Sequence, residues 1–217
     1  MLKAIIFDLD DTLLKTKQTK FEALKFAGKH FYNLELTDET LLKHWGKPFM
    51  QFMGDAFEHV DSPENLAHNY KSIVKNYQNQ PYENTVPTLE ILSHQYKMGI
   101  LSATAKSIVL YDMEQAGLPM NKFTYIQTED DTNVHKPNPK VFAPMIRVMA
   151  EYEIVPADML YIGDHPTDFQ ASTGAGLQFI GMAERTISAA EFATMGARSI
   201  DSIVQLPSVL AEKFAHE

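Results

Sequence analysis

From residue 84 to the C-terminus, the sequence alternates short apolar runs with segments of helix length. The runs are MGILSA, FTYIQ, MLYIGD and LQFIGM, at residues 98–103, 123–127, 159–164 and 177–182, and KAIIFD at residues 3–8 adds a fifth. Near-continuous apolar strands that alternate with helices are typical of a parallel sheet covered on both faces. The sequence therefore predicts five strands in an α/β, doubly wound, Rossmann-like fold.

Helix signals follow these runs. KSIVLYDMEQAGL closes on Gly117, and Pro139 suits the first turn of the segment that continues with KVFAPMIRVMAEY. The SAAE segment is a capping box, with Ser188 as N-cap and Glu191 three residues later. These signals support the strand and helix alternation.

Residues 15–84 interrupt the pattern with helical signals and no convincing strand. SPENLAHNYKSIVKNY begins with Ser62 as N-cap and Pro63 at the first helical position, and its apolar residues fall on one face at positions Leu66, Tyr70, Ile73, Val74 and Tyr77. A looser stripe comprises Phe21, Leu24, Ala27 and Phe31. We expect an inserted all-helical cap domain at 15–84 and a catalytic core at 1–14 and 85–217, with hinges at KTKQTK and NQPYENT.

Charge and composition exclude several classes of function. The net charge is -9 and the Lys and Arg residues are spread singly, so no basic stripe is available to a nucleic acid backbone. The chain has no cysteine, which excludes disulfides, thiolate catalysis and Cys-ligated metals. No signal peptide or membrane span is apparent. We expect a soluble, cytoplasmic protein with neither nucleic acid nor membrane as partner, as a monomer or homodimer.

Polar residues gather where the predicted strands end. In a parallel sheet, ligands bind beyond the carboxyl ends of the strands. The candidates found there, including one loop residue in VHKPNP, are Asp8, Asp10, Ser102, Lys136, Asp164 and Asp168. Carboxylates without cysteine or paired histidines suit a hard cation such as Mg²⁺. A hydroxyl and a lysine can donate to phosphoryl oxygens, so the set indicates phosphoryl transfer.

The chain resembles the haloacid dehalogenase superfamily, in particular its phosphoglycolate phosphatase-like branch with a helical C1-type cap. FDLDDT matches the family's D-x-D-x-T strand end, and Ser102 matches the Ser or Thr that ends the second motif. Lys136 in HKPNP matches the K-P-x-P lysine, and GDHPTD matches G-D-x-x-x-D. The four motifs occur in the family's order along the whole chain.

The resemblance implies a Mg²⁺-dependent phosphatase that hydrolyses a small phosphate monoester. Asp8 would be the nucleophile that forms an aspartyl-phosphate, and Asp10 would protonate the leaving oxygen and then activate water. Ser102 and Lys136 would bind phosphoryl oxygens. The implied Mg²⁺ ligands are Asp8, the backbone carbonyl of Asp10, Asp164 and Asp168, the last of them directly or through a neighbouring group.

Two residues depart from the family pattern. Asp11 stands where many relatives have Gly, and Ala103 stands where relatives often have Asn after the second-motif hydroxyl. Thr104 is a rival to Ser102 for the hydroxyl role. We interpret His165 as a rim residue and Trp45 as packed within the cap, with Lys43, His44 and Lys47 as candidate substrate contacts on the cap.

Three alternatives remain open at this point. A phosphomutase of the β-phosphoglucomutase type would return the phosphoryl group to a sugar. A 2-haloacid dehalogenase would need neither Mg²⁺ nor an acid at Asp10. A signalling receiver domain would hold its phosphoaspartate without turnover, although such domains have no insertion of this size.

Overall fold

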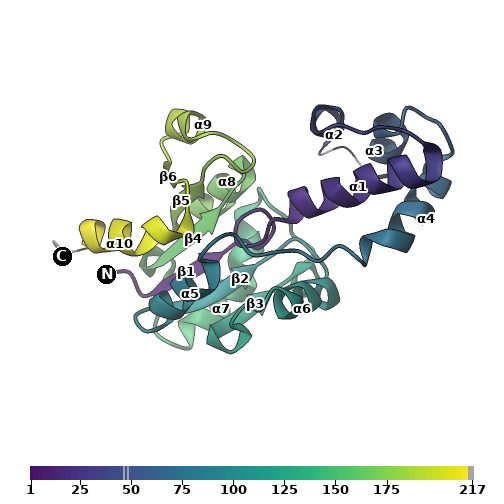
Figure 1. Ribbon diagram of the computed structural model, residues 1–217. Helices are drawn as coiled ribbons and strands as arrows, with labels where there is room; N and C mark the ends of the chain where they lie inside the picture. The colour runs from purple at the N-terminus through teal and green to yellow at the C-terminus, as the bar shows by residue number, and fades with distance from the viewer. Residues whose placement is uncertain (46, 48, 215–217) are drawn as a thin grey trace. The chain divides into compact units, whose positions relative to one another are not determined.

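A computed structural model describes residues 1–45, 47 and 49–214 of the chain. The chain divides into two compact units, one built from residues 1–15 and 81 onward and the other from residues 16–80 (Figure 1). The last three residues of the predicted core, 215–217, lie outside the described part. The functions of the two units as catalytic core and cap stay predictions.

The larger unit contains a parallel sheet of six strands in the order β3-β2-β1-β4-β5-β6. The strands are β1 Ala4–Phe7, β2 Lys97–Leu101, β3 Phe123–Gln127, β4 Met159–Gly163, β5 Gln178–Met182 and β6 Arg198–Ile200. The predicted doubly wound α/β fold is confirmed, but the count of five strands was wrong. The missed strand, β6, has only three residues, too few to show a pattern, and only Ile200 is buried.

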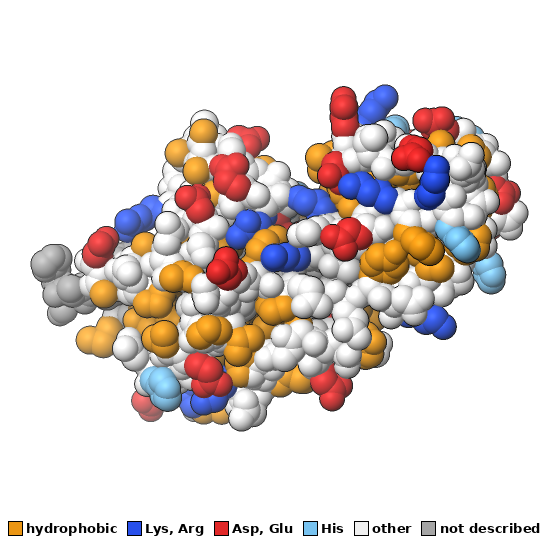
Figure 2. Space-filling model, in the orientation of Figure 1, with side chains coloured by type: hydrophobic (Ala, Val, Ile, Leu, Met, Phe, Trp, Pro, Cys, Tyr) orange, Lys and Arg blue, Asp and Glu red, His pale blue; other side chains and the backbone are white. Residues whose placement is uncertain are grey.

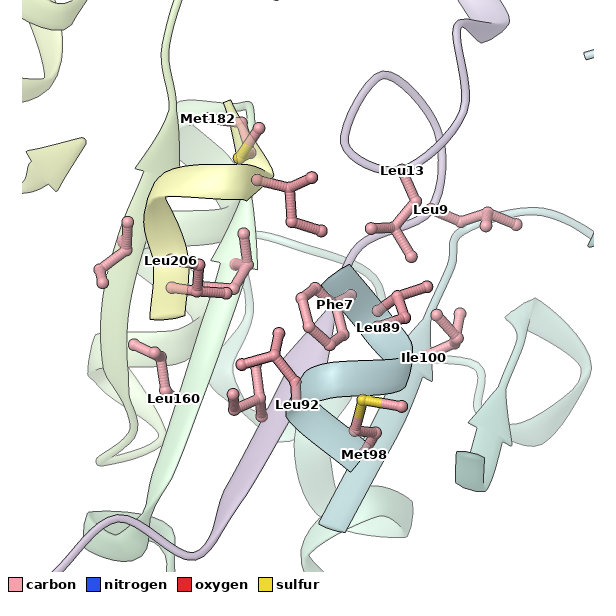
Figure 3. Close-up of a cluster of buried hydrophobic side chains, with 14 of the residues drawn as sticks. Phe7, Leu9, Leu13, Leu89, Leu92, Met98, Ile100, Leu160, Met182 and Leu206 are labelled. Atoms are coloured by element: carbon pink, nitrogen blue, oxygen red, sulfur yellow. The ribbon is translucent and has the colours of Figure 1, made fainter. Parts of the chain in front are cut away.

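One face of the sheet is covered by three helices, α5 Thr85–Ser93, α6 Lys106–Gln115 and α10 Leu206–Phe214. Side chains alternate along a strand, so Ile5 and Phe7 point to this face while Ala4 and Ile6 point to the other. Phe7 lies in a cluster with Leu89 of α5, Ile100 of β2 and Leu160 of β4 (Figure 3). Each such fully buried side chain stabilises the fold by roughly 1.5–3 kcal/mol.

The opposite face carries α7 Ala143–Ala150, α8 Pro166–Gly174 and α9 Ala189–Thr194, whose buried residues include Met145, Ala171 and Phe192. Short 3₁₀ turns, at Met120–Lys122, Glu129–Asp131, Pro139–Phe142, Pro156–Asp158 and Ile203–Gln205, complete the connections. The Ser188 and Glu191 capping box at the start of α9 is confirmed. Apolar cover on both faces leaves only the strand ends for polar chemistry.

The smaller unit is a helical bundle with its own apolar core. Its helices are α1 Thr16–Tyr32, α2 Asp38–His44, α3 Phe49–Ala56 and α4 Pro63–Val74. Ser62 caps α4 as predicted, and its hydroxyl accepts the Asn65 N–H at 3.2 Å. Phe31 was wrongly included in the stripe of α1, because it is exposed while Gly28 is buried.

The surface offers two observations on partners. On the face drawn in Figure 2, Lys and Arg side chains are scattered among acidic ones. Among the helices that the structure describes, none combines the length and apolar character required to cross a bilayer.

Candidate active site

The carboxyl ends of β1 and β4 carry Asp8 and Asp164, which the sheet topology brings together. The strand order reverses between these central neighbours, and such a switch point is where α/β sheets bind ligands. The Asp8 N–H donates to the Ile162 carbonyl at 2.8 Å, which continues the ladder by one residue beyond β1. Asp164 directly follows β4. Both carboxylates are buried, with 6% and 5% of their surface exposed.

A tight loop after β1 carries Asp10. The N–H groups of Leu13 and Leu14 both donate to the Leu9 carbonyl, each at 3.0 Å, which folds residues 9–14 into a compact turn. Asp11 lies in this turn with φ 56°, the left-handed region. Asp tolerates that region better than most residues, so the turn forms here without a glycine.

Two hydroxyls hold the Asp10 carboxylate. Thr104 Oγ1 donates to Asp10 Oδ2 at 3.0 Å, and Ser102 Oγ lies at 3.5 Å from the same oxygen. The Thr104 N–H donates to Ser102 Oγ at 3.1 Å, which fixes the two residues relative to each other. Both hydroxyls therefore belong to the site, and the one that the sequence gives as the rival, Thr104, makes the shorter bond.

Lys136 joins three side chains in the buried part of the site. Its Nζ donates to Asp8 Oδ1 at 2.6 Å, Asp168 Oδ1 at 2.7 Å and the Tyr161 hydroxyl at 3.0 Å. Burial alone would lower the pKa of Lys136, but the Asp168 and Asp8 carboxylates outweigh it and raise the pKa well above its ordinary value. Lys136 therefore stays a cation and fixes Asp8.

Tyr161 is a site residue that the sequence analysis missed. It belongs to β4, where MLYIGD indicates only a buried apolar strand. Its hydroxyl nevertheless lies beside Lys136 and within 3.5 Å of Asp8 Oδ1. Burial raises its pKa well above the ordinary value, so the phenol stays neutral.

Both oxygens of Asp168 accept hydrogen bonds from the protein. Oδ1 accepts from Lys136, and Oδ2 accepts the His165 N–H at 3.0 Å at the start of α8. Gly163 makes room for this carboxylate, because a Cβ at that position would lie 2.5 Å from Asp168 Oδ2. The Gly in the G-D-x-x-x-D motif is thus required by the side chain five residues later.

Asp164 has a different environment from Asp168. Its Oδ2 accepts a hydrogen bond from Thr186 Oγ1, in the loop after β5. Burial, followed by the charge of Asp168, raises its pKa to about 7 against the lowering effect of Thr186. Burial also raises the pKa of Asp8, although Lys136 opposes it. Thr186 was not singled out from the sequence.

The donor set fits a hard cation. Asp8 and Asp164 are buried carboxylates with raised pKa values, and a dication would offset the desolvation that raises them. In the described part of the chain, no three His, Asp or Glu side chains form a ready-made metal cage. Mg²⁺ usually takes one or two carboxylates and completes its shell with water and substrate phosphate, and Asp8 and Asp164 would supply two carboxylates.

His165 contacts the site through its backbone N–H. Its side chain is exposed, as expected for a rim residue, and Nδ1 lies 2.8 Å from Thr167 Oγ1. Trp45 packs edge-on against Phe21 and Phe52 within the helical unit, as expected. In the same unit, Lys47 is paired with Asp55 at 2.6 Å.

Comparison with known proteins identifies the family. A sequence profile described as haloacid dehalogenase-like hydrolase matches residues 5–182, which include all the predicted site residues. The chain belongs to the haloacid dehalogenase-like hydrolases. The family is thus confirmed on most of the chain, and the protein is an enzyme of the hydrolase class.

Relatives of this haloacid dehalogenase-like hydrolase have different substrates in their names. Pyrophosphatase PpaX of Anoxybacillus flavithermus is 27% identical over 192 residues, covering 84% of both chains. Phosphoglycolate phosphatase of Nitrosospira multiformis is 26% identical over 187 residues, covering 81% of this chain and 80% of its own. A Thermotoga maritima structure, provisionally assigned as a β-phosphoglucomutase, superposes with a TM-score of 0.82 at 21% identity, covering 97% and 99% of the two chains.

Proposed function

We propose that this hydrolase is a Mg²⁺-dependent phosphatase that acts on a small phosphate monoester through an aspartyl-phosphate. The observation that carries the proposal is the contact of Lys136 with Asp8, beside an Asp10 held by two hydroxyls. This contact supports Asp8 as a nucleophile held in one orientation and Asp10 as the neighbouring acid–base group. The relatives named as phosphatases and pyrophosphatases support the same chemistry.

In the first step, an Asp8 oxygen attacks phosphorus and the bond to the leaving oxygen breaks. Lys136 holds Asp8 Oδ1 and prevents the carboxylate from rotating. Asp10, in its protonated form, donates its proton to the leaving oxygen, so that the alcohol departs neutral. The products of this step are the alcohol and the aspartyl-phosphate.

In the second step, Asp10 serves as a base. It takes a proton from a water molecule, whose oxygen attacks phosphorus and breaks the bond to Asp8. Inorganic phosphate leaves, and both carboxylates return to their starting states. Thr104 and Ser102 keep Asp10 in one orientation through both steps, and we assign the phosphoryl oxygens to Lys136 and the Ser102 hydroxyl.

Asp8, Asp164 and the Asp10 carbonyl would hold Mg²⁺, which when bound neutralises charge on the phosphoryl oxygens. We infer that Asp168 acts through Lys136, because its two oxygens accept bonds from Lys136 and the His165 N–H. Residues 16–80 would form the cap that selects the substrate. We expect a small phosphorylated metabolite as partner, in the cytoplasm.

The test is phosphate release from a panel of monoesters, with Mg²⁺ and with excess EDTA. Asp8→Asn should abolish metal-dependent release. Asp158→Asn is the matched control, because Asp158 lies at the other end of β4 and forms surface ion pairs with Lys3 and the N-terminus. Unchanged release from Asp8→Asn would refute the proposed nucleophile.

Two further substrates belong in the panel. Inorganic pyrophosphate is included because the PpaX relatives carry the name pyrophosphatase. A sugar phosphate is included because one structural neighbour carries a mutase assignment. Isomer formation without free phosphate would favour a phosphomutase over the proposed hydrolysis.

A further inference from the structure

The helical unit contains a cavity of about 410 Å³ that the proposed hydrolysis does not use. Aromatic rings form most of its wall, and two ammonium groups complete it. The lining residues are Lys20, Leu24, Trp45, Lys47, Phe49, Phe52 and Tyr70. Its volume falls in the range of cavities that bind small organic molecules.

The floor of this cavity is part of the bundle core and is therefore rigid. Leu24, Phe52 and Tyr70 are buried, and they come from three different helices. Burial raises the pKa of Tyr70 to about 12, so its hydroxyl stays neutral. A floor built from packed core residues keeps its shape when the cavity is filled.

Two large aromatic side chains at the cavity remain exposed to solvent. Trp45 is 37% exposed and Phe49 is 42% exposed. Trp45 meets the Phe52 ring edge-on at 5.7 Å, and Phe49 is tilted against Tyr70 at 6.2 Å. A flat ring entering the cavity would find both faces and edges of aromatic side chains, the arrangement that aromatic pairs prefer.

The charge at the cavity is positive. Lys47 is held by Asp55 at 2.6 Å, so its charge is partly offset. Lys20 is half-buried, and no ion pair joins it to another residue in the described ranges. Among the described residues that line the cavity, none is acidic. The charge therefore favours an anionic ligand over a neutral or cationic one.

We propose that this cavity binds a small organic anion that carries an aromatic ring. The ring fills the space between Trp45, Phe49 and Tyr70, and the anionic group faces Lys20. The site lies within the helical unit alone and goes beyond the proposed hydrolysis. Its ligand is a separate small aromatic anion, bound by the helical unit independently of the phosphate site.

Trp45 provides a direct readout, because it is the only tryptophan of the chain. The full-length protein is titrated with phenylphosphonate in excess EDTA, and the tryptophan emission is followed. We expect a saturable change in emission. Methylphosphonate has no ring and benzyl alcohol has no charge. Each should reach half of its emission change only at concentrations at least about tenfold higher than phenylphosphonate requires. Equal responses to phenylphosphonate and methylphosphonate would overturn the proposal.

Variants locate the site. Phe49→Ala and Lys20→Met should each weaken phenylphosphonate binding about tenfold. Phe26→Ala is the control, because Phe26 is 46% exposed on α1 and stacks on His30 outside the cavity. Circular dichroism verifies that each variant is folded. Loss of the response in Ser102→Ala would instead assign the ligand to the phosphate site and refute the cavity.

Steady-state kinetics tests whether this ligand is separate from the substrate. We expect Phe49→Ala to leave KM for phenyl phosphate and for methyl phosphate unchanged while its fluorescence response weakens. A raised KM for phenyl phosphate alone would assign the ring to the substrate and overturn the separate ligand. The titration requires no turnover, so failure of the proposed phosphatase activity does not affect it.

Discussion

Replacing Asp164 by Asn should stabilise the metal-free protein at alkaline pH. The Asp164 carboxyl is buried, and its pKa in the fold is about 7 against an ordinary 3.8. The folded protein therefore holds the proton more tightly than the unfolded chain does. This stabilising contribution is present below the unfolded pKa and is lost as the pH rises through about 7. Above that pH, the fold bears the full cost of an ionised Asp164.

The magnitude follows from the difference between the two pKa values. At 1.36 kcal/mol per pH unit, a difference from 3.8 to about 7 corresponds to roughly 4 kcal/mol. Asn removes this cost, and its amide oxygen can still accept from the Thr186 hydroxyl. For a chain of this size, about 2–4 °C per kcal/mol gives an expected rise in Tm of roughly 8–16 °C.

The assay is thermal unfolding in excess EDTA at about pH 5 and about pH 8. The gain of Asp164→Asn should be larger at the higher pH, and added Mg²⁺ should stabilise wild type more than the variant. Asp158→Asn is the control, and its effect on Tm should have the opposite sign. Burial would raise the Asp158 pKa, but the ion pairs with Lys3 and the N-terminus outweigh it and lower the pKa, so the ionised Asp158 stabilises the fold. A Tm of Asp164→Asn at or below wild type at the higher pH would refute the reasoning.

Three other substitutions test the contacts of the site. Lys136→Met should lower the free energy of unfolding by about 3–5 kcal/mol, because the buried carboxylates of Asp8 and Asp168 lose their cation. Denaturant titration measures this loss, and phosphate release should be abolished as well. Gly163→Ala should lower kcat at least about tenfold by displacing Asp168, whereas Gly99→Ala meets chiefly flexible side-chain ends and should retain activity. Thr104→Val should lower kcat about tenfold with Tm nearly unchanged, because Asp10, the proposed acid–base group, loses its nearest hydroxyl donor.

Hydrophobic patterning was sufficient to predict most of the sheet. Apolar runs such as MLYIG identify buried parallel strands because both of their faces are covered by helices. The same signal fails for β6, where three residues at the sheet edge bury little. On α1, Phe31 has the same helical spacing as the buried residues before it, yet it is exposed. Its exposure depends on where the bundle ends, which cannot be predicted from residue spacing.

The site divides in a similar way. Asp8 and Asp164 could be predicted because they directly follow strands, and topology brings such ends together. Tyr161 could not, since a tyrosine within an apolar strand gives no sign that its hydroxyl reaches Lys136. Thr186 could have been found by applying the strand-end rule to the fifth strand as well, because it lies in the loop after β5.

The charge of the site explains why catalysis and stability are opposed in this fold. Lys136 contacts only two of the four carboxylates, and Asp164 is left with a strongly raised pKa. When all four acids are ionised, the site is three charges more negative than positive, and a phosphate dianion would be repelled. A divalent cation offsets two of these three charges and gives the phosphoryl oxygens a cationic partner, so substrate affinity should depend on the metal even in a variant that cannot react. Binding of phosphate to Asp8→Asn should therefore be detectable with Mg²⁺ and lost in EDTA.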